Sequence, residues 1–122
     1  MNKKNKIIIV EDDEHLAKIY KLKFESEGIN SIVISDSEEA VARIFLEKPD
    51  LVLLDLILPK KDGFWVLEQV RQNKEFMNTP IIVLSNMWEQ KDRERALVLG
   101  ANDFLVKNDV SIEEVAERVR KA

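Results

Sequence analysis

Leu51-Val52-Leu53-Leu54-Asp55-Leu56-Ile57-Leu58-Pro59 is the stretch that decides the fold of this chain. Four apolar residues precede Asp55 and three follow it, so one carboxylate stands within a run that is otherwise typical of a protein interior. Burying an ionised group is costly unless opposite charge or hydrogen bonds offset the cost. If residues 51–54 form a buried strand, Asp55 lies at its carboxyl end, where open α/β sheets bind ligands. The simpler alternative is that Asp55 only caps the next turn.

The composition around this stretch predicts one globular domain over residues 1–122, since single domains peak near ~100–150 residues. The net charge of −4, from 19 basic and 23 acidic residues, argues against direct binding of nucleic acid. The absence of cysteine excludes disulfides, thiolate zinc sites and thiol nucleophiles. The first apolar run, Ile7 to Val10, is too short for a signal peptide or a membrane span. We therefore expect a cytoplasmic protein without a membrane partner.

Short apolar runs alternate with segments of helical periodicity along the chain. The runs are typical of strands buried on both faces and lie at residues 7–10, 32–34, 51–54, 81–84 and 104–106. The helical segments carry their apolar stripes at residues 16–24, 40–45, 64–70, 96–99 and 112–119. This alternation predicts a doubly wound α/β domain, with a five-stranded parallel sheet and five helices on both faces.

Local signals refine two of the predicted helices. Asp36 with Glu39, and Ser111 with Glu114, have the spacing of capping boxes at helix starts. No apolar residue occurs from position 89 to 95, so the helix predicted there can pack only through residues near its end. We expect that helix to be loosely docked.

Polar residues follow four of the five predicted strands. Glu11, Asp12 and Asp13 follow the first strand and Asp55 the third, while Ser85 and Lys107 follow the fourth and fifth. Because the carboxyl ends of parallel strands lie along one edge, the fold gathers these side chains into one crevice.

The charges in this crevice predict a divalent cation. Glu11, Asp12 and Asp55 contribute −3 and Lys107 contributes +1, which leaves −2. A few carboxylates with waters, and no His or Cys, is the usual way in which proteins hold Mg²⁺. A carboxylate beside Mg²⁺ and a lysine is placed to attack phosphorus and form an aspartyl-phosphate, and Asp55 is the candidate nucleophile.

Three motifs resemble those of the receiver domains of bacterial two-component response regulators, which have a flavodoxin-like fold with strand order 2-1-3-4-5. IIVEDD (8–13) is similar to the acidic-pair motif of that family, and LVLLDLILPKKDG (51–63) to its phosphoacceptor motif. GANDFLVK (100–107) is similar to its final-strand motif. The resemblance covers essentially the whole chain.

The resemblance implies a role for each site residue. It makes Asp55 the phosphorylated residue, and it assigns the metal to Asp12, Asp55, the backbone carbonyl of Ile57 and, through a water, Glu11. It also gives the phosphoryl group hydrogen-bonding, switch and binding partners, namely Ser85, Phe104 and Lys107. Asn86 follows Ser85 where the family usually has a small residue, and it would either donate to the phosphoryl group or crowd its pocket. Asn86, Asn108 and Trp65 depart from the usual residues of the family, and because Asn108 stands in place of proline we expect a trans bond after Lys107.

The implied function is that of a signalling phosphoacceptor rather than an enzyme. The donor would be a sensor histidine kinase or a histidine phosphotransfer protein, and the signal would pass to a downstream protein or to a second copy of the chain. Phosphorylation would draw Ser85 inward, let Phe104 follow, and move the polar helix near residues 88–99. Met87 and Trp88 are candidate anchors for a partner, with packing on a neighbouring loop as the alternative for Trp88.

Two other functions fit the same fold. A flavin-binding electron carrier would need a first loop that cradles phosphate, and the acids at positions 11–14 disfavour it. A receiver-like module that binds proteins without being phosphorylated is the alternative that Asn86 and Asn108 keep open.

Overall fold

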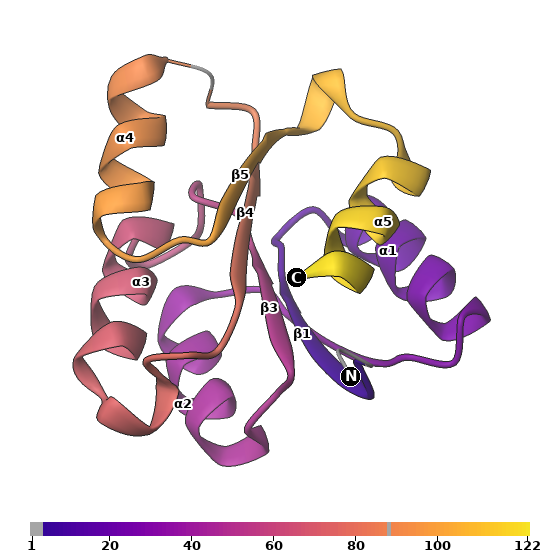
Figure 1. The fold of residues 1–122 in the computed structure, drawn as a ribbon, viewed down its shortest axis with the longest axis horizontal. Helices are drawn as coiled ribbons and strands as arrows, with labels where there is room; N and C mark the ends of the chain where they lie inside the picture. The colour runs from indigo at the N-terminus through magenta and orange to yellow at the C-terminus, as the bar shows by residue number, and fades with distance from the viewer. Residues whose placement is uncertain (1–3, 88) are drawn as a thin grey trace.

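The computed structural model describes residues 4–87 and 89–122, in which strands alternate with helices along the chain (Figure 1). The strands are β1 (Lys6–Val10), β2 (Asn30–Ile34), β3 (Leu51–Leu54), β4 (Ile81–Ser85) and β5 (Asp103–Val106). The helices are α1 (Glu14–Ser26), α2 (Ser37–Glu47), α3 (Gly63–Gln72), α4 (Gln90–Val98) and α5 (Ile112–Lys121). Two short 3₁₀ helices, η1 (Lys74–Phe76) and η2 (Lys107–Asp109), were not predicted from the sequence.

The strands form one parallel sheet in the order β2-β1-β3-β4-β5, which confirms the predicted architecture. β3 lies at the centre, between β1 and β4. The register pairs Val10 of β1 with Leu54 of β3 and with Ile34 of β2, so these three strands end side by side. The order reverses between β1 and β3, and open α/β sheets bind ligands at that point.

Alternate residues of each central strand enter different cores, which explains why the strands are apolar throughout. Ile7 and Ile9 of β1 pack in the core beneath α1 and α5. Ile8 and Val10 pack in the core beneath α2, α3 and α4. Figure 1 shows the same division, with α1 and α5 on one side of the sheet and α2, α3 and α4 on the other.

Side-chain caps fix the starts of several helices. Ser111 and Glu114 form the predicted capping box of α5. At α2, the Asp36 carboxylate accepts a hydrogen bond from the Glu39 amide at 2.8 Å, but no return bond from the Glu39 side chain is seen among the described residues. The second predicted capping box is therefore only half formed.

Helix α4 is held to the domain by few contacts, as its polar sequence predicted. Ala96 is its one buried residue. The guanidinium of Arg95 lies 4.1 Å from the centre of the Phe64 ring of α3, and that of Arg93 lies 5.8 Å from the centre of the Phe104 ring of β5. Arginine side chains thus replace much of the apolar packing that anchors the other helices.

No helix within the described ranges is both long enough and apolar enough to cross a membrane.

Candidate functional site

Backbone pairing brings Glu11 and Asp55 together at the switch point of the sheet. Each residue directly follows one of the paired residues Val10 and Leu54. The Asp55 amide donates to the Val10 carbonyl at 3.0 Å, and the Glu11 amide donates to the Ile34 carbonyl at 3.0 Å. The sheet ladder therefore continues one residue beyond the strands and fixes the two carboxylates beside each other.

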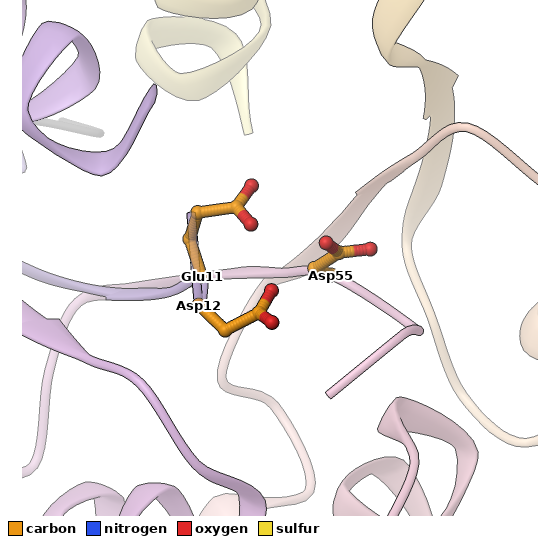
Figure 2. A group of neighbouring side chains, drawn as sticks. All are labelled: Glu11, Asp12 and Asp55. Atoms are coloured by element: carbon orange, nitrogen blue, oxygen red, sulfur yellow. The ribbon is translucent and has the colours of Figure 1, made fainter. Parts of the chain in front are cut away.

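Three carboxylates from β1 and β3 face the same space. Figure 2 shows Glu11 and Asp12 pointing to the side on which Asp55 lies. Glu11 and Asp55 are only 3% and 6% exposed, whereas Asp12 is exposed to solvent. One oxygen from each of the three lies within 4.8 Å of the others. Such a spacing allows the three groups to share one cation.

Lys107 supplies the positive charge beside these carboxylates. Its ammonium lies 2.5 Å from Glu11 Oε1 and 2.8 Å from Asp55 Oδ2. Burial alone would lower the pKa of Lys107, but the hydrogen bonds to Asp55 and Glu11 raise its pKa overall. The lysine is therefore held in its charged form. It is the first residue of η2, directly after β5, and the peptide bond to Asn108 is trans as predicted.

Burial also shapes the ionisation of Glu11 and of the neighbouring Tyr20. Burial raises the pKa of Glu11, and the charge of Asp55 adds to this effect, while the bonds from Lys107 and from the Asp13 amide oppose it. Burial raises the pKa of Tyr20 to about 12. Tyr20 lines a narrow gap together with Glu11 and Asp55, so it lies beside the two buried carboxylates.

A cavity of about 310 Å³ opens above the carboxylates. It is lined by Glu11, Asp12, Asp13, Asp55, Ile57, Asn86 and Lys107. The structure thus brings together six of the eight residues predicted for the site. Asn86 is exposed at the rim, and the Ile57 amide donates to Asp55 Oδ1 at 3.2 Å.

The other two predicted residues, Ser85 and Phe104, lie outside this lining. Ser85 is fully buried at the end of β4, where its hydroxyl accepts a bond from the Met87 amide at 3.4 Å. Phe104 is 3% exposed in the core beneath α2, α3 and α4, so its ring already lies inward in this structure. Of the two predicted partner anchors, Met87 is half-buried against the same core, and Trp88 lies outside the described residues.

The residues of the cavity fit a hard divalent cation. The donors are all oxygens, two of the three carboxylates are buried, and their combined charge exceeds that of Lys107. A cluster of this kind selects ions such as Mg²⁺ that prefer carboxylates and water. Glu11, Asp12 and Asp55 are therefore the residues that could hold a metal.

Two further residues lie at the site or contact its loop: Asp13, which the sequence placed in the crevice without a role, and Ser37 of α2, which it did not indicate. Asp13 lines the cavity, donates its amide to Glu11 Oε2 at 3.2 Å, and caps α1 through the Leu16 amide. Its position in the acidic run and three residues before Leu16 was the available signal. Ser37 contacts the loop after β3 through its buried hydroxyl, and no sequence motif indicated that contact.

Comparison with known proteins gives a consistent result. The family model described as "Response regulator receiver domain" matches residues 7–120. The chain is 41% identical over 98% of its length to the alkaline phosphatase synthesis transcriptional regulatory protein PhoP of Bacillus subtilis, and 40% identical over 95% to the transcriptional regulatory protein CpxR of Escherichia coli K12. Each match covers 48% of the relative, so the chain spans about half the length of the curated relatives it matches.

Solved structures agree in fold over nearly the full chain. The BeF₃-activated receiver domain of RstA from Klebsiella pneumoniae has a TM-score of 0.88 at 30% identity, covering 96% of this chain and 97% of that one. The receiver domain of Francisella response regulator 1452 has a TM-score of 0.87 at 32% identity, covering 96% and 94%. The Mn²⁺-bound form of response regulator Rcp1 has a TM-score of 0.81 at 27% identity, covering 96% and 90%.

Proposed function

Because this chain belongs to the response regulator receiver domain family, we propose that Asp55 accepts a phosphoryl group with Mg²⁺ bound beside it. The observation that carries the proposal is the contact of the Lys107 ammonium with Asp55, next to three carboxylates that can share a cation. Receiver domains are signalling phosphoacceptors rather than classical enzymes. The chemistry required of this chain is therefore one transfer to its own side chain.

The donor that we propose is a sensor histidine kinase or a histidine phosphotransfer protein. An Asp55 carboxylate oxygen attacks the phosphorus of a phosphohistidine, the new O–P bond forms as the P–N bond breaks, and the imidazole nitrogen keeps the electron pair. Lys107 holds the carboxylate in place before transfer and offsets the added negative charge afterwards. When bound, Mg²⁺ supplies further charge compensation for the phosphoryl oxygens.

The ligands that we propose for the cation are the carboxylates of Asp12 and Asp55, the backbone carbonyl of Ile57 and, through a water, Glu11. Glu11 is buried, its Oε1 atom is engaged by Lys107, and its Oε2 atom accepts a hydrogen bond from the Asp13 amide. Ser85 and Asn86, at the end of β4, would donate hydrogen bonds to the phosphoryl group. Phe104 and α4 would then repack, which the sparse anchoring of α4 supports.

The signal leaves through the surface of the domain in this proposal. Relatives about twice as long carry names that describe transcriptional regulators. The recipient here would be a downstream protein, or a second copy of the chain.

Incubation with acetyl phosphate, with and without Mg²⁺, followed by intact mass measurement tests the proposal. We expect a mass increase of one phosphoryl group only with Mg²⁺, and none for Asp55→Asn. Asp50→Asn is a matched control, because Asp50 lies outside the cavity lining and bonds the backbone amides of Asn5 and Lys6. A wild-type chain that gains no mass with Mg²⁺ would support the phosphorylation-independent binding module instead.

A further inference from the structure

We propose that Ser37 of α2 is a positioning residue for the phosphorylation site, because its buried hydroxyl clamps the loop that follows Asp55. The inference rests on the proposed function of Asp55 and extends it to a different helix. Ser37 is fully buried and is the first residue of α2, directly after the capping Asp36.

The hydroxyl of Ser37 bridges two backbone groups of one turn. It donates to the Pro59 carbonyl at 3.0 Å and accepts from the Lys61 amide at 2.8 Å. Its donor and one of its acceptor sites are therefore both used on the loop rather than within α2. Ser37 itself is fully buried while Pro59 and Lys61 are exposed, so the two bonds tie an exposed loop to a hydroxyl enclosed by the packing around α2.

Between these two anchors, Lys60 has an unfavourable backbone conformation. Its φ angle is +73°, in the left-handed region that residues other than glycine rarely adopt. The Lys60 ammonium lies 3.7 Å from Asp36 Oδ1 and 3.7 Å from Glu38 Oε1, but it is 55% exposed, and exposed pairs hold a conformation weakly. The buried Ser37 bridge is thus the contact that maintains the turn.

This turn is directly continuous with the site. The Gly63 amide donates to the Leu56 carbonyl at 2.8 Å, which closes the base of the loop, while Ser37 fixes its tip. Ile57 lies between these two points, lines the cavity, and donates its amide to Asp55 Oδ1 at 3.2 Å. A fixed loop therefore holds in place the Ile57 amide that bonds Asp55, and with it the residue whose carbonyl is a proposed ligand. Groups that orient ligands in this way tune metal affinity.

Ser31 provides a matched comparison within the same chain. It is also a buried serine, at 2% exposure, but among residues 4–87 and 89–122 its hydroxyl bonds only the Ile29 carbonyl near its own strand, at 3.5 Å. Replacing either serine with alanine removes one buried hydroxyl, and only the replacement at Ser37 releases the loop.

The experiment compares Ser37→Ala with Ser31→Ala in the full chain. We expect Ser37→Ala to speed hydrogen exchange at the Lys61 amide and to weaken Mg²⁺ binding, measured by calorimetry, by roughly tenfold. Phosphorylation by acetyl phosphate should need more Mg²⁺ but reach a near wild-type rate at saturation. Ser31→Ala should leave the Lys61 exchange rate and the Mg²⁺ affinity unchanged.

A rescue variant separates positioning from a general loss of stability. Asparagine tolerates the left-handed region better than lysine, so adding Lys60→Asn to Ser37→Ala should recover part of the lost Mg²⁺ affinity. The role of Ser37 is overturned if Ser37→Ala keeps wild-type exchange at Lys61 and wild-type Mg²⁺ affinity, or if Lys60→Asn restores none of a lost affinity. A wild-type chain that binds no Mg²⁺ overturns the proposed function itself, and the role of Ser37 with it.

Discussion

At the scale of one residue, Glu11 shows the cost in stability of burying a carboxylate in a cluster that could hold a cation. Burial raises its pKa, which means that the folded chain binds the Glu11 proton more tightly than the unfolded chain does. The stabilising contribution of Glu11 is therefore complete below the unfolded value of 4.5 and is lost as the pH rises through the raised folded value. Once it is charged, the buried Glu11 opposes folding of the metal-free protein relative to its neutral form.

We predict that Glu11→Gln raises the melting temperature of the metal-free protein at pH 7 by a few degrees and weakens Mg²⁺ binding. The wild type should gain stability as the pH falls from 7 toward 5, and the variant should lack that gain. The pKa is lowered for three other glutamates, Glu27, Glu47 and Glu117. Their contribution to stability is therefore lost as the pH falls below 4.5, which is opposite in sign to the effect of Glu11. Melting curves from pH 5 to 7 in EDTA measure the effect, and a lower melting temperature for Glu11→Gln at pH 7 would contradict it.

Glycine is required at position 63 because this residue packs closely against the backbone that follows β3. A Cβ atom there would lie 2.4 Å from the Asp55 carbonyl oxygen and 2.7 Å from the Leu56 Cα, and neither backbone atom can move alone. We predict that Gly63→Ala costs about 1–3 kcal/mol of unfolding free energy, as overpacked sites do, and weakens Mg²⁺ binding by displacing Asp55. Urea denaturation and calorimetry measure the two effects.

Gly28 is the control for this substitution. A Cβ atom there would meet nothing within 4 Å, although φ is +80°. Asparagine tolerates a positive φ angle, so Gly28→Asn should leave the Mg²⁺ affinity unchanged. Equal Mg²⁺ affinities in Gly63→Ala and the wild type would show that the loop absorbs the clash without moving Asp55.

Helix α4 is the element whose attachment depends most on single contacts. Because Ala96 is its one buried residue, the stacking of Arg95 on Phe64 forms a large part of its attachment to α3. We predict that Arg95→Ala removes about 0.5–1 kcal/mol and speeds hydrogen exchange across residues 90–98, with little change at β3. Lys91→Ala is the control, because the Lys91 side chain is 76% exposed and forms an ion pair with the nearby Glu89 at 3.6 Å. Equal exchange rates in both variants would exclude the stacking role.

The elements themselves were largely predictable, and their ends were less so. Continuous apolar runs predicted all five strands, because a parallel sheet covered on both faces excludes polar side chains. β2 begins at Asn30 and β5 at Asp103, before their apolar runs, since these edge strands pair on one side only and tolerate polar residues. The 3₁₀ helices η1 and η2 follow from local turns with no apolar periodicity, so the sequence pattern did not reveal them.

At the scale of the whole molecule, the site is a point where negative charge is concentrated in an acidic chain. Any ligand that binds only the folded state stabilises it by mass action, by about 2.7 kcal/mol at a hundredfold excess over the dissociation constant. We predict that Mg²⁺ raises the melting temperature and that EDTA reverses the rise. Asp12→Asn should abolish the rise without destabilising the fold, because Asp12 is exposed. Sodium chloride at matched ionic strength is the control, and an equal rise with that salt would exclude a specific site.

Sheet topology made it predictable that the site residues would lie close together. Parallel strands place residues 11, 12, 55 and 107 at one edge whatever the details of the loops, and the structure brings them together there. The bridge from Ser37 was not predictable, because it depends on how the α2 crossover meets a loop more than twenty residues away. The place of Tyr20 beside the site likewise depends on the rotation of α1, since its helical stripe indicated only a buried side chain.

Lys107 follows β5, which is the outermost strand on its side of the sheet and pairs only with β4. During synthesis, residues 11 and 55 therefore leave the ribosome long before the ammonium that completes their environment. A chain folded only as far as β4 would hold the carboxylates of Glu11 and Asp55 without the ammonium that contacts both of them. Under the proposed function, the ability to accept a phosphoryl group would thus arrive with the last strand of the sheet.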